Sequence, residues 1–251
     1  MPDDHRLARD LAARVGQRLL GLRAQGGDPD MLRKAGDRLS HDFLTAELAA
    51  RRPGDVVLSE EGADNPARLA ARRVWIVDPL DGTREFGEPG RTDWAVHVAL
   101  WQDGDLTAGA VALPAQGAVL STAEPPPPPH DGAPGRIRIV VSRSRPPRFV
   151  RNISGLIDAE LVPLGSAGAK VAAVVNGEVD AYVHGGGFYE WDTAAPVAVA
   201  RAAGLHASRI DGSALAYNQA DLLMPDILVC RPAVAGTLLQ AIREVTNAPA
   251  S

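Results

Sequence analysis

Apolar residues recur near the start of the chain at the spacing of an amphipathic helix. The residues of this apolar stripe are three or four positions apart: Leu7, Leu11, Val15, Leu19 and Leu22. They predict a first helix that ends near Gly26. A second helix is expected from Ser40, a suitable N-cap, to about Arg51, because Pro53 cannot continue it.

Short apolar runs bounded by turn residues follow, and each has the length of a strand. In the first half these runs cover residues 56–58, 74–77, 94–100, 106–113 and 119–122. In the second half, strands are expected at 137–141, 181–183 and 227–230, and helices at 148–159, 167–176, 191–203 and 234–245. This alternation predicts an α/β protein in which helices and sheets form layers.

The run EPPPPPHDGAPG, from Glu124 to Gly135, separates the two patterns. Its proline density excludes a helix or a central strand and is typical of an exposed connector. We therefore expect an N-terminal α+β half over residues 1–124, a connector over 125–135, and a C-terminal α/β half over 136–251.

Composition narrows the class of protein. The chain has 251 residues, a net charge of −5 and no long basic stripe, so a nucleic-acid partner is not expected. No apolar run has the length of a membrane span, and the charged N-terminus does not resemble a secretory signal. The single cysteine, Cys230, cannot form an internal disulfide. A cytoplasmic protein without a membrane partner is the expectation.

The stretch VWIVDPLDGTREF, from Val74 to Phe86, carries the strongest chemical signal. An apolar strand leads into Asp78 and Asp81, which lie three residues apart in a proline and glycine turn. Two buried carboxylates about 4 Å apart repel by about 4 kcal/mol at an effective dielectric constant of about 20, so a cation is expected between them. Mg²⁺ is a hard cation that binds such oxygen ligands. An isolated DxxD is more often a solvated turn, but the full string is more specific.

Two further acidic motifs are distant in the sequence. Glu60 follows another short strand, and Asp192 stands at the start of an apolar helix behind Trp191. Taken singly, each has a common structural explanation, a solvated strand end or a helix cap. Together, the three motifs indicate a phosphate site with two or three metal ions.

At this point the chain resembles a known family. DPLDGT, the preceding pair Glu60-Glu61 and WDTAA from Trp191 are similar to the Mg²⁺-dependent, lithium-sensitive inositol monophosphatase superfamily over nearly the whole chain. Further motifs resemble its CysQ-type nucleotide phosphatases: KAGDRLSHD, VVSRSR, LGSAGAK and LAYNQADLLMP. The resemblance implies the alternating αβαβα layers of that family. It also implies hydrolysis of the 3'-phosphate of 3'-phosphoadenosine 5'-phosphate, and of the related adenylyl sulfate, in sulfur metabolism.

The resemblance also implies roles for individual residues. The metal ligands would be Glu60, Asp78, Asp81, Asp192 and the Leu80 carbonyl. Asp42, Glu60 and Thr83 would act on the attacking water, and Gly82 and Thr83 would bind the scissile phosphate. The remaining substrate contacts would be Lys34, Ser142, Arg143 and Lys170 for a second phosphate, and Ser166, Tyr189 and Glu190 for the nucleoside. Asp42 is placed only by its spacing from Ser40, because KAGDRLSHDFLTAEL departs from the usual KADxSPVTxAD.

The reaction implied is direct attack of water on phosphorus, without a covalent enzyme intermediate and with a small phosphate ester as substrate. The six histidines form no spaced pair that resembles a triad or a zinc site, and each is expected to be a surface or packing residue, apart from His184 as a substrate contact. Three alternatives stay open: a nucleotide phosphatase, an inositol or fructose-bisphosphate phosphatase, and an inactive phosphate-binding module. A homodimer is what the resemblance suggests.

Overall fold

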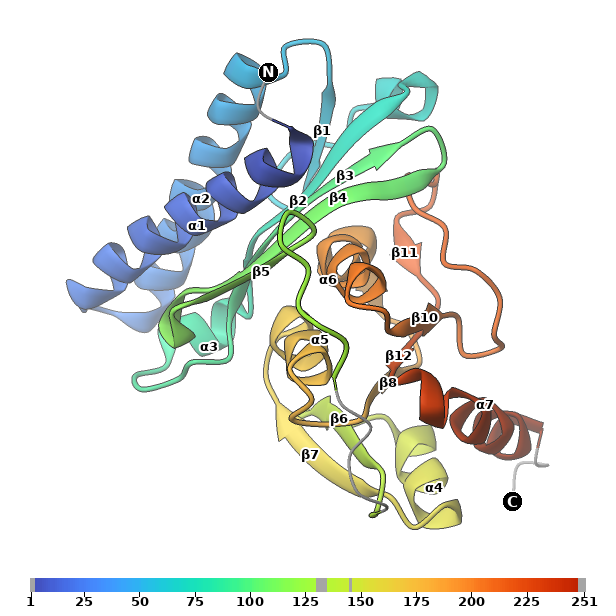
Figure 1. The fold of residues 1–251 in the computed structure, drawn as a ribbon. Helices are drawn as coiled ribbons and strands as arrows, with labels where there is room; N and C mark the ends of the chain where they lie inside the picture. The colour runs from blue at the N-terminus through green and yellow to red at the C-terminus, as the bar shows by residue number, and fades with distance from the viewer. Residues whose placement is uncertain (1–2, 130–134, 145, 248–251) are drawn as a thin grey trace.

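Two long helices cover one face of a five-stranded sheet (Figure 1). The computed structural model describes residues 3–129, 135–144 and 146–247. The helices are α1 (Asp4–Ala24) and α2 (Pro29–Arg51). The strands lie in the order β1 (Val56–Ser59), β2 (Arg73–Asp81), β3 (Ala95–Gln102), β4 (Asp105–Leu113) and β5 (Ala118–Ser121). Only the β1–β2 pair is parallel among these neighbours.

Three short helical segments connect these strands. They are η1 (Pro66–Ala70) between β1 and β2, α3 (Thr83–Gly87) between β2 and β3, and η2 (Pro114–Gln116) between β4 and β5. Thr83 is the first residue of α3, directly after the glycine turn at Gly82.

The second half forms another five-stranded sheet, in the order β10-β12-β8-β6-β7. Its strands are β6 (Arg138–Ser142), β7 (Glu160–Leu164), β8 (Ala181–His184), β10 (His206–Ser208) and β12 (Ile227–Cys230). Its helices are α4 (Arg148–Leu156), α5 (Ala167–Val175), α6 (Glu190–Ala202) and α7 (Pro232–Asn247). A separate pair joins β9 (Phe188–Tyr189) to β11 (Leu223–Met224).

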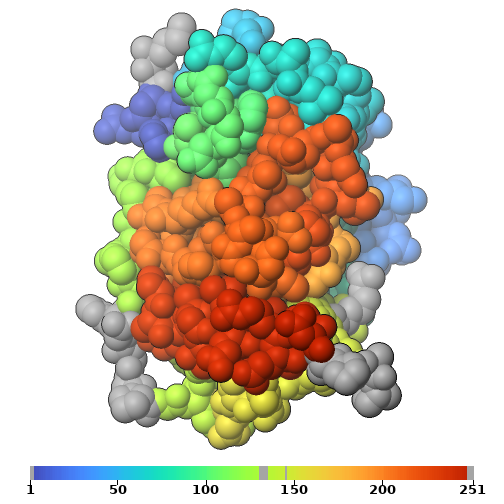
Figure 2. Space-filling model, turned by 90° about the vertical axis from the view of Figure 1, so that its right-hand side faces the viewer, coloured from blue at the N-terminus to red at the C-terminus, as the bar shows by residue number. Residues whose placement is uncertain are grey.

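Three apolar clusters lie between the layers and hold them together. One joins α1 and α2 to the first sheet, and another joins α4 and α7 to the second sheet. The largest lies between the two sheets and includes α5 and α6. The order is therefore helices, sheet, helices, sheet, helices, as the alternating pattern predicts (Figure 1). Figure 2 shows one side of the molecule, with the C-terminal helix in dark red across its lower part.

The second helix begins much earlier than the expected start at Ser40. Asp28 caps it by accepting hydrogen bonds from the amides of Asp30 and Met31, and Pro29 occupies the first turn, where a missing N–H costs nothing. Ser40 is buried in the middle of α2. This shift matters for the site, because it places residues 34–42 on one continuous helix.

Part of the expected connector packs against the protein. Pro128 lies near Gly204, and Pro129 lies near Gly177. Residues 130–134 of that connector lie outside the described residues. Within the described ranges, no helix is long and apolar enough to cross a membrane.

Candidate active site

The end of β2 delivers two aspartates to one place. Asp78 pairs with His97 on β3, and the pairing then shifts before Asp81, so the strand bulges at Pro79 and Leu80. Gly82 follows with a φ of 85°, and a Cβ there would lie 2.9 Å from the Cβ of Ser166. Only glycine suits this left-handed turn at such a close approach.

Glu60 reaches the same place from the end of β1. Its amide donates to the Val77 carbonyl at 3.3 Å, and its side chain hydrogen-bonds to Asp78. Although part of this residue is exposed to solvent, burial of the carboxyl group raises the pKa of Glu60 to about 7. The Asp78 hydrogen bond opposes this rise, and the charges of Asp192 and Asp81 add to it.

Asp192 comes from the other half of the chain, in the first turn of α6. Its Oδ2 accepts a hydrogen bond from the Tyr189 amide at 2.6 Å, so it also serves as part of a capping box. Burial, followed by repulsion from Asp81, raises the pKa of Asp192 to about 6. Packing of α6 on the first sheet brings this carboxylate to the end of β2.

The structure thus brings together four acidic residues: Glu60, Asp78, Asp81 and Asp192. Burial and then the neighbouring carboxylates raise the pKa of Asp78 well above its usual range. Such a set of oxygen donors is unfavourable when all are ionised unless a cation lies among them. The cluster therefore has the chemistry of a metal site.

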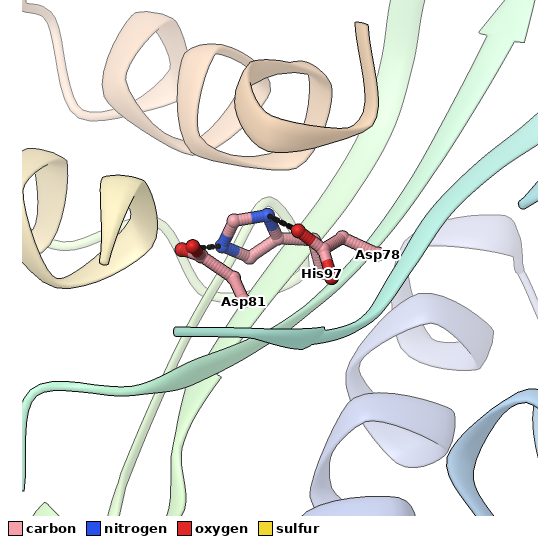
Figure 3. Close-up of side chains that lie close together, drawn as sticks. All are labelled: Asp78, Asp81 and His97. Carbon is pink, nitrogen blue, oxygen red and sulfur yellow. Dashed lines mark ion pairs between the residues drawn. The ribbon is translucent and has the colours of Figure 1, made fainter. Parts of the chain in front are cut away.

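His97 lies against two members of this cluster (Figure 3). Asp78, Asp81 and His97 are all buried, and one side-chain ligand atom of each lies within 4.8 Å of those of the other two. Burial is the largest effect and lowers the pKa of His97, but the charge of Asp81 and the hydrogen bonds to Asp81 and the Trp191 carbonyl together outweigh it, so the net shift is upward. No sequence motif connected His97 with the site, because it stands in an apolar strand and was expected to be a packing or surface residue.

An unexpected carboxylate meets Thr83. The Thr83 hydroxyl lies 3.4 Å from Asp37 Oδ1 and 3.0 Å from the Leu80 carbonyl oxygen. Burial, repulsion from Glu61 and a moderating hydrogen bond from Thr83 set the pKa of Asp37 at about 6. Asp37 belongs to α2, and its neighbour Gly36 brings that helix close to the turn.

Asp42 does not reach the site where the sequence pattern placed it. Its side chain is 65% exposed and pairs with Arg38 one turn earlier on the same helix, at 3.7 Å. Because α2 is continuous from Pro29, Asp37 and Asp42 point in different directions, and Asp37 faces Thr83. Gly36 was the sequence signal that this part of the helix lies close to the turn. A Cβ at position 36 would lie 2.8 Å from Phe86 and 2.9 Å from Leu80.

A cavity of about 480 Å³ opens beside Asp81 and Asp192. Basic and hydroxyl side chains line it: Arg84, Ser142, Arg143, Ser144, Ser166 and Lys170. His184 and Phe188 line another part of it, with ring centroids 5.0 Å apart. The cavity therefore combines acidic, basic, hydroxyl and aromatic side chains.

Lys170 is the buried cation of this cavity. Its ammonium group donates to the Gly165 carbonyl and lies 5.4 Å from the centre of the Tyr182 ring. Burial lowers the pKa of Lys170, and the charges of Asp81 and nearby acids oppose that shift. The ammonium thus offers a positive charge close to the acidic cluster.

Three predicted substrate residues lie elsewhere. Glu190 is fully buried, and its two oxygens accept hydrogen bonds from the amides of Asn218 and Asn218's neighbour Gln219, at 2.6 and 2.7 Å. This carboxylate fixes a loop and is not directed to a ligand. Tyr189 is 44% exposed and stacks on Trp191, and neither it nor the exposed Lys34 is among the residues that line the cavity.

This chain belongs to the inositol monophosphatase family, whose model matches residues 7–247. The family is metal-dependent, in agreement with the acidic cluster described above, and its members that resemble this chain are phosphatases.

Relatives within the family are more specific. The chain is 52% identical to the 3'-phosphoadenosine 5'-phosphate phosphatase of Mycobacterium leprae, over 96% of this chain and 94% of that one. The corresponding protein of Mycobacterium tuberculosis is also 52% identical, over 92% and 90%. Identity to the Escherichia coli 3'(2'),5'-bisphosphate nucleotidase CysQ is 34%, over 73% and 78%.

Solved structures share the fold. CysQ from Bacteroides thetaiotaomicron has a TM-score of 0.78 at 28% identity, covering 89% of this chain and 95% of that one. Inositol monophosphatase II from Staphylococcus aureus has a TM-score of 0.80 at 22% identity, covering 94% and 92%. At 22% identity, the similarity to the Staphylococcus aureus protein supports a shared fold only.

Proposed function

We propose that this phosphatase removes the 3'-phosphate of 3'-phosphoadenosine 5'-phosphate in a Mg²⁺-dependent reaction. The observation that carries the proposal is a cavity lined both by Asp81 and Asp192 of the acidic cluster and by basic groups that include Arg143 and Lys170. A substrate with two phosphates needs donors for each, and these two sets of side chains can serve the reacting phosphate and the second phosphate. The name of the 52% identical relatives supports the same substrate.

The residues fit a hard divalent cation. Mg²⁺ prefers carboxylate and carbonyl oxygens, and the ligands we propose are Glu60, Asp78, Asp81, Asp192 and the Leu80 carbonyl. The raised pKa values of Glu60 and Asp192 reflect burial and repulsion between carboxylates, and a bound cation would relieve that repulsion. When bound, two or three such ions supply positive charge that offsets the charge of the phosphate and of the leaving alkoxide.

The chain's own residues supply the acid–base chemistry. We assign the orientation of the attacking water to the pair Thr83 and Asp37, with Glu60 beside it, because this hydroxyl and these carboxyl groups lie at the end of β2. A carboxylate with a pKa near neutrality accepts a proton more readily than an ordinary one. Gly82 and Thr83 would bind the scissile phosphate through their amides.

The second phosphate is assigned to the basic and hydroxyl groups of the cavity. Ser142, Arg143 and Lys170 line the cavity, and charge-assisted donors of this kind bind phosphate strongly. Ser166 and the aromatic wall of His184 and Phe188 would contact the nucleoside. Tyr189 and Glu190 are left out of this assignment, because they do not line the cavity.

Phosphate release distinguishes the substrates. The purified chain would be given adenosine 3',5'-bisphosphate, inositol 1-phosphate or fructose 1,6-bisphosphate, each with Mg²⁺ and with excess chelator. The proposal requires the highest kcat/KM for the nucleotide and loss of release with chelator. A preference for inositol 1-phosphate or fructose 1,6-bisphosphate would assign the chain to another substrate class on the same fold. Equal phosphate release with and without chelator would refute the metal assignment.

A further inference from the structure

The imidazole of His97 lies where the end of β2 meets the start of α6. The ring is wholly buried. Its Nε2 is 3.2 Å from Asp81 Oδ2, and its Nδ1 is 3.1 Å from the Trp191 carbonyl and 3.9 Å from Asp78 Oδ2 (Figure 3). One ring thus connects β3 to a proposed metal ligand and to the residue that precedes another, Asp192.

Every polar neighbour of the two ring nitrogens is an oxygen acceptor. Among the described residues, no donor hydrogen-bonds to Nδ1 or Nε2. The Nε2 contact has the distance of an ion pair without the direction of a regular hydrogen bond. Both ring nitrogens therefore lie against protein oxygens, and His97 is not among the residues that line the cavity.

The space around the ring is closed by the first turn of α5. The Gly168 amide donates to Asp81 Oδ2 at 2.6 Å, and the Ala167 amide donates to Oδ1 at 3.2 Å. A Cβ on Gly168 would lie 2.2 Å from His97 Nε2, so only glycine leaves room for the ring. The Asp81 carboxylate is therefore held from two sides, by α5 and by His97.

We propose that His97 is a positioning residue of the metal site and not one of its ligands. Its ring fixes the Asp81 carboxylate relative to the first turn of α6, so that Asp81 and Asp192 face the same cation. This inference rests on the proposed metal site but does not depend on which phosphate ester is hydrolysed. Residues outside the coordination sphere commonly change metal affinity by about 10- to 100-fold.

Two amide substitutions separate the two contacts of the ring. His97→Gln places an amide nitrogen near the position of Nε2 and keeps a donor for Asp81. His97→Asn places its amide nitrogen near Nδ1 and keeps the donor for the Trp191 carbonyl, but it cannot reach Asp81. Electron paramagnetic resonance measures Mn²⁺ binding to the full chain without substrate. This readout does not depend on turnover. Thermal unfolding with chelator reports whether each variant folds.

We expect H97N to weaken Mn²⁺ binding about tenfold or more and H97Q to weaken it less. Unchanged Mn²⁺ affinity in both folded variants would overturn the positioning role. Pulsed resonance of the Mn²⁺-loaded wild-type chain tests the other half without any substitution. We expect no ¹⁴N coupling of the size that a directly bound nitrogen gives, and such a coupling would make His97 a ligand.

The outcomes also separate this inference from the proposed function. Suppose that H97N binds Mn²⁺ more weakly, but the wild-type chain releases phosphate from none of the three esters. The positioning role would then be retained, and the phosphatase assignment would be removed. If H97N does not fold, H97Q and the wild-type resonance decide the question: a Mn²⁺ affinity of H97Q far below that of the wild type, or a bound nitrogen, counts against the proposal.

Discussion

Asp93 holds Arg143 at the edge of the cavity, with Arg143 Nη2 3.0 Å from Asp93 Oδ2. The same carboxylate accepts the Gly165 amide at 2.7 Å and two donors of Arg91. Asp93 is buried, so its hydrogen bonds are shielded from water. It therefore fixes, at one point, the ends of β6 and β7 that carry the proposed contacts for the second phosphate.

Asp93→Asn should weaken recognition of the second phosphate. Loss of a charge-assisted bond leaves Arg143 free to leave its position, and we expect KM for adenosine 3',5'-bisphosphate to rise about fivefold to tenfold with kcat nearly unchanged. Adenosine 3'-monophosphate, which lacks the second phosphate, should show a much smaller change in KM. An equal rise for both nucleotides would mean that Asp93 supports the site as a whole.

Asp226→Asn is the matched control for that experiment. Asp226 also binds one arginine twice, at 2.7 Å from Arg209, and accepts a backbone amide, from Ile210, at 2.8 Å. Neither Asp226 nor Arg209 lines the cavity. This variant should therefore lose stability to a similar extent and keep the kinetic constants of the wild type for both nucleotides.

Asp37→Asn should lower kcat by about 10²- to 10⁴-fold, because an amide cannot accept the proton of the attacking water. Asp37 is only half-buried, so the variant should fold, and its unfolding temperature with Mg²⁺ should stay within a few degrees of the wild type. Asp42→Asn on the same helix is the control, with an exposed side chain and wild-type kcat expected. A large loss in Asp42→Asn with normal activity in Asp37→Asn would reverse the assignment.

Glu190→Gln tests whether this residue supports the loop or the substrate. One amide oxygen can still accept from Asn218 or Gln219, but the amide nitrogen then faces a second N–H in a buried place. We expect the free energy of unfolding to fall by about 2 kcal/mol, measured by urea denaturation. KM for the nucleotide should change by less than about threefold; a large KM change at unaltered stability would return Glu190 to the substrate site.

The metal-free chain should lose stability as pH rises from about 4.5 to about 7. The pKa of Glu60 rises from 4.5 to about 7 on folding, and those of Asp37 and Asp192 rise from 3.8 to about 6. A raised carboxyl pKa contributes stability that is fully present below the unfolded value and is lost as pH passes the folded value. Aspartates with a lowered pKa, such as Asp81, act below about pH 4 and so outside this window, whereas the lowered pKa of His206 opposes the decline near its upper end.

Thermal unfolding in chelator across this pH range measures the effect. Mg²⁺ should restore more stability at pH 8 than at pH 5, because ionised carboxylates are what it binds. Glu60→Gln removes one titrating group and should flatten the decline. A wild-type unfolding temperature that stays constant from pH 4.5 to 7 in chelator would contradict the acidic crowding described for the cluster.

The sequence predicted the parts of the site that lie in local motifs. Asp78 and Asp81 follow an apolar strand in a proline and glycine turn, and Asp192 stands at the start of a helix, so each position follows from the immediate neighbours in the chain. The layered fold was predicted in the same way, from strand and helix periods. Short strands such as β7, β9 and β10 were missed, because they carry little periodic signal.

Residues that depend on packing between elements were not predicted. Asp37 was missed because the start of α2 was placed at Ser40, although Asp28 and Pro29 form a good N-terminal cap. His97 was missed because it stands among apolar residues in its strand, and its contacts with α5 and α6 form only when these helices pack on the sheet. Glu190 was assigned to the substrate, because the amides that donate hydrogen bonds to it lie nearly 30 residues further along the chain, in a loop whose position only the folded protein defines.

The acidic centre is completed late along the chain. Glu60 and Asp78 precede the proline-rich run, whereas Asp192 arrives on α6, which packs against the first sheet. Because we propose Asp192 as a metal ligand, we expect a product that ends before α6 to lack one ligand of the site and to be inactive.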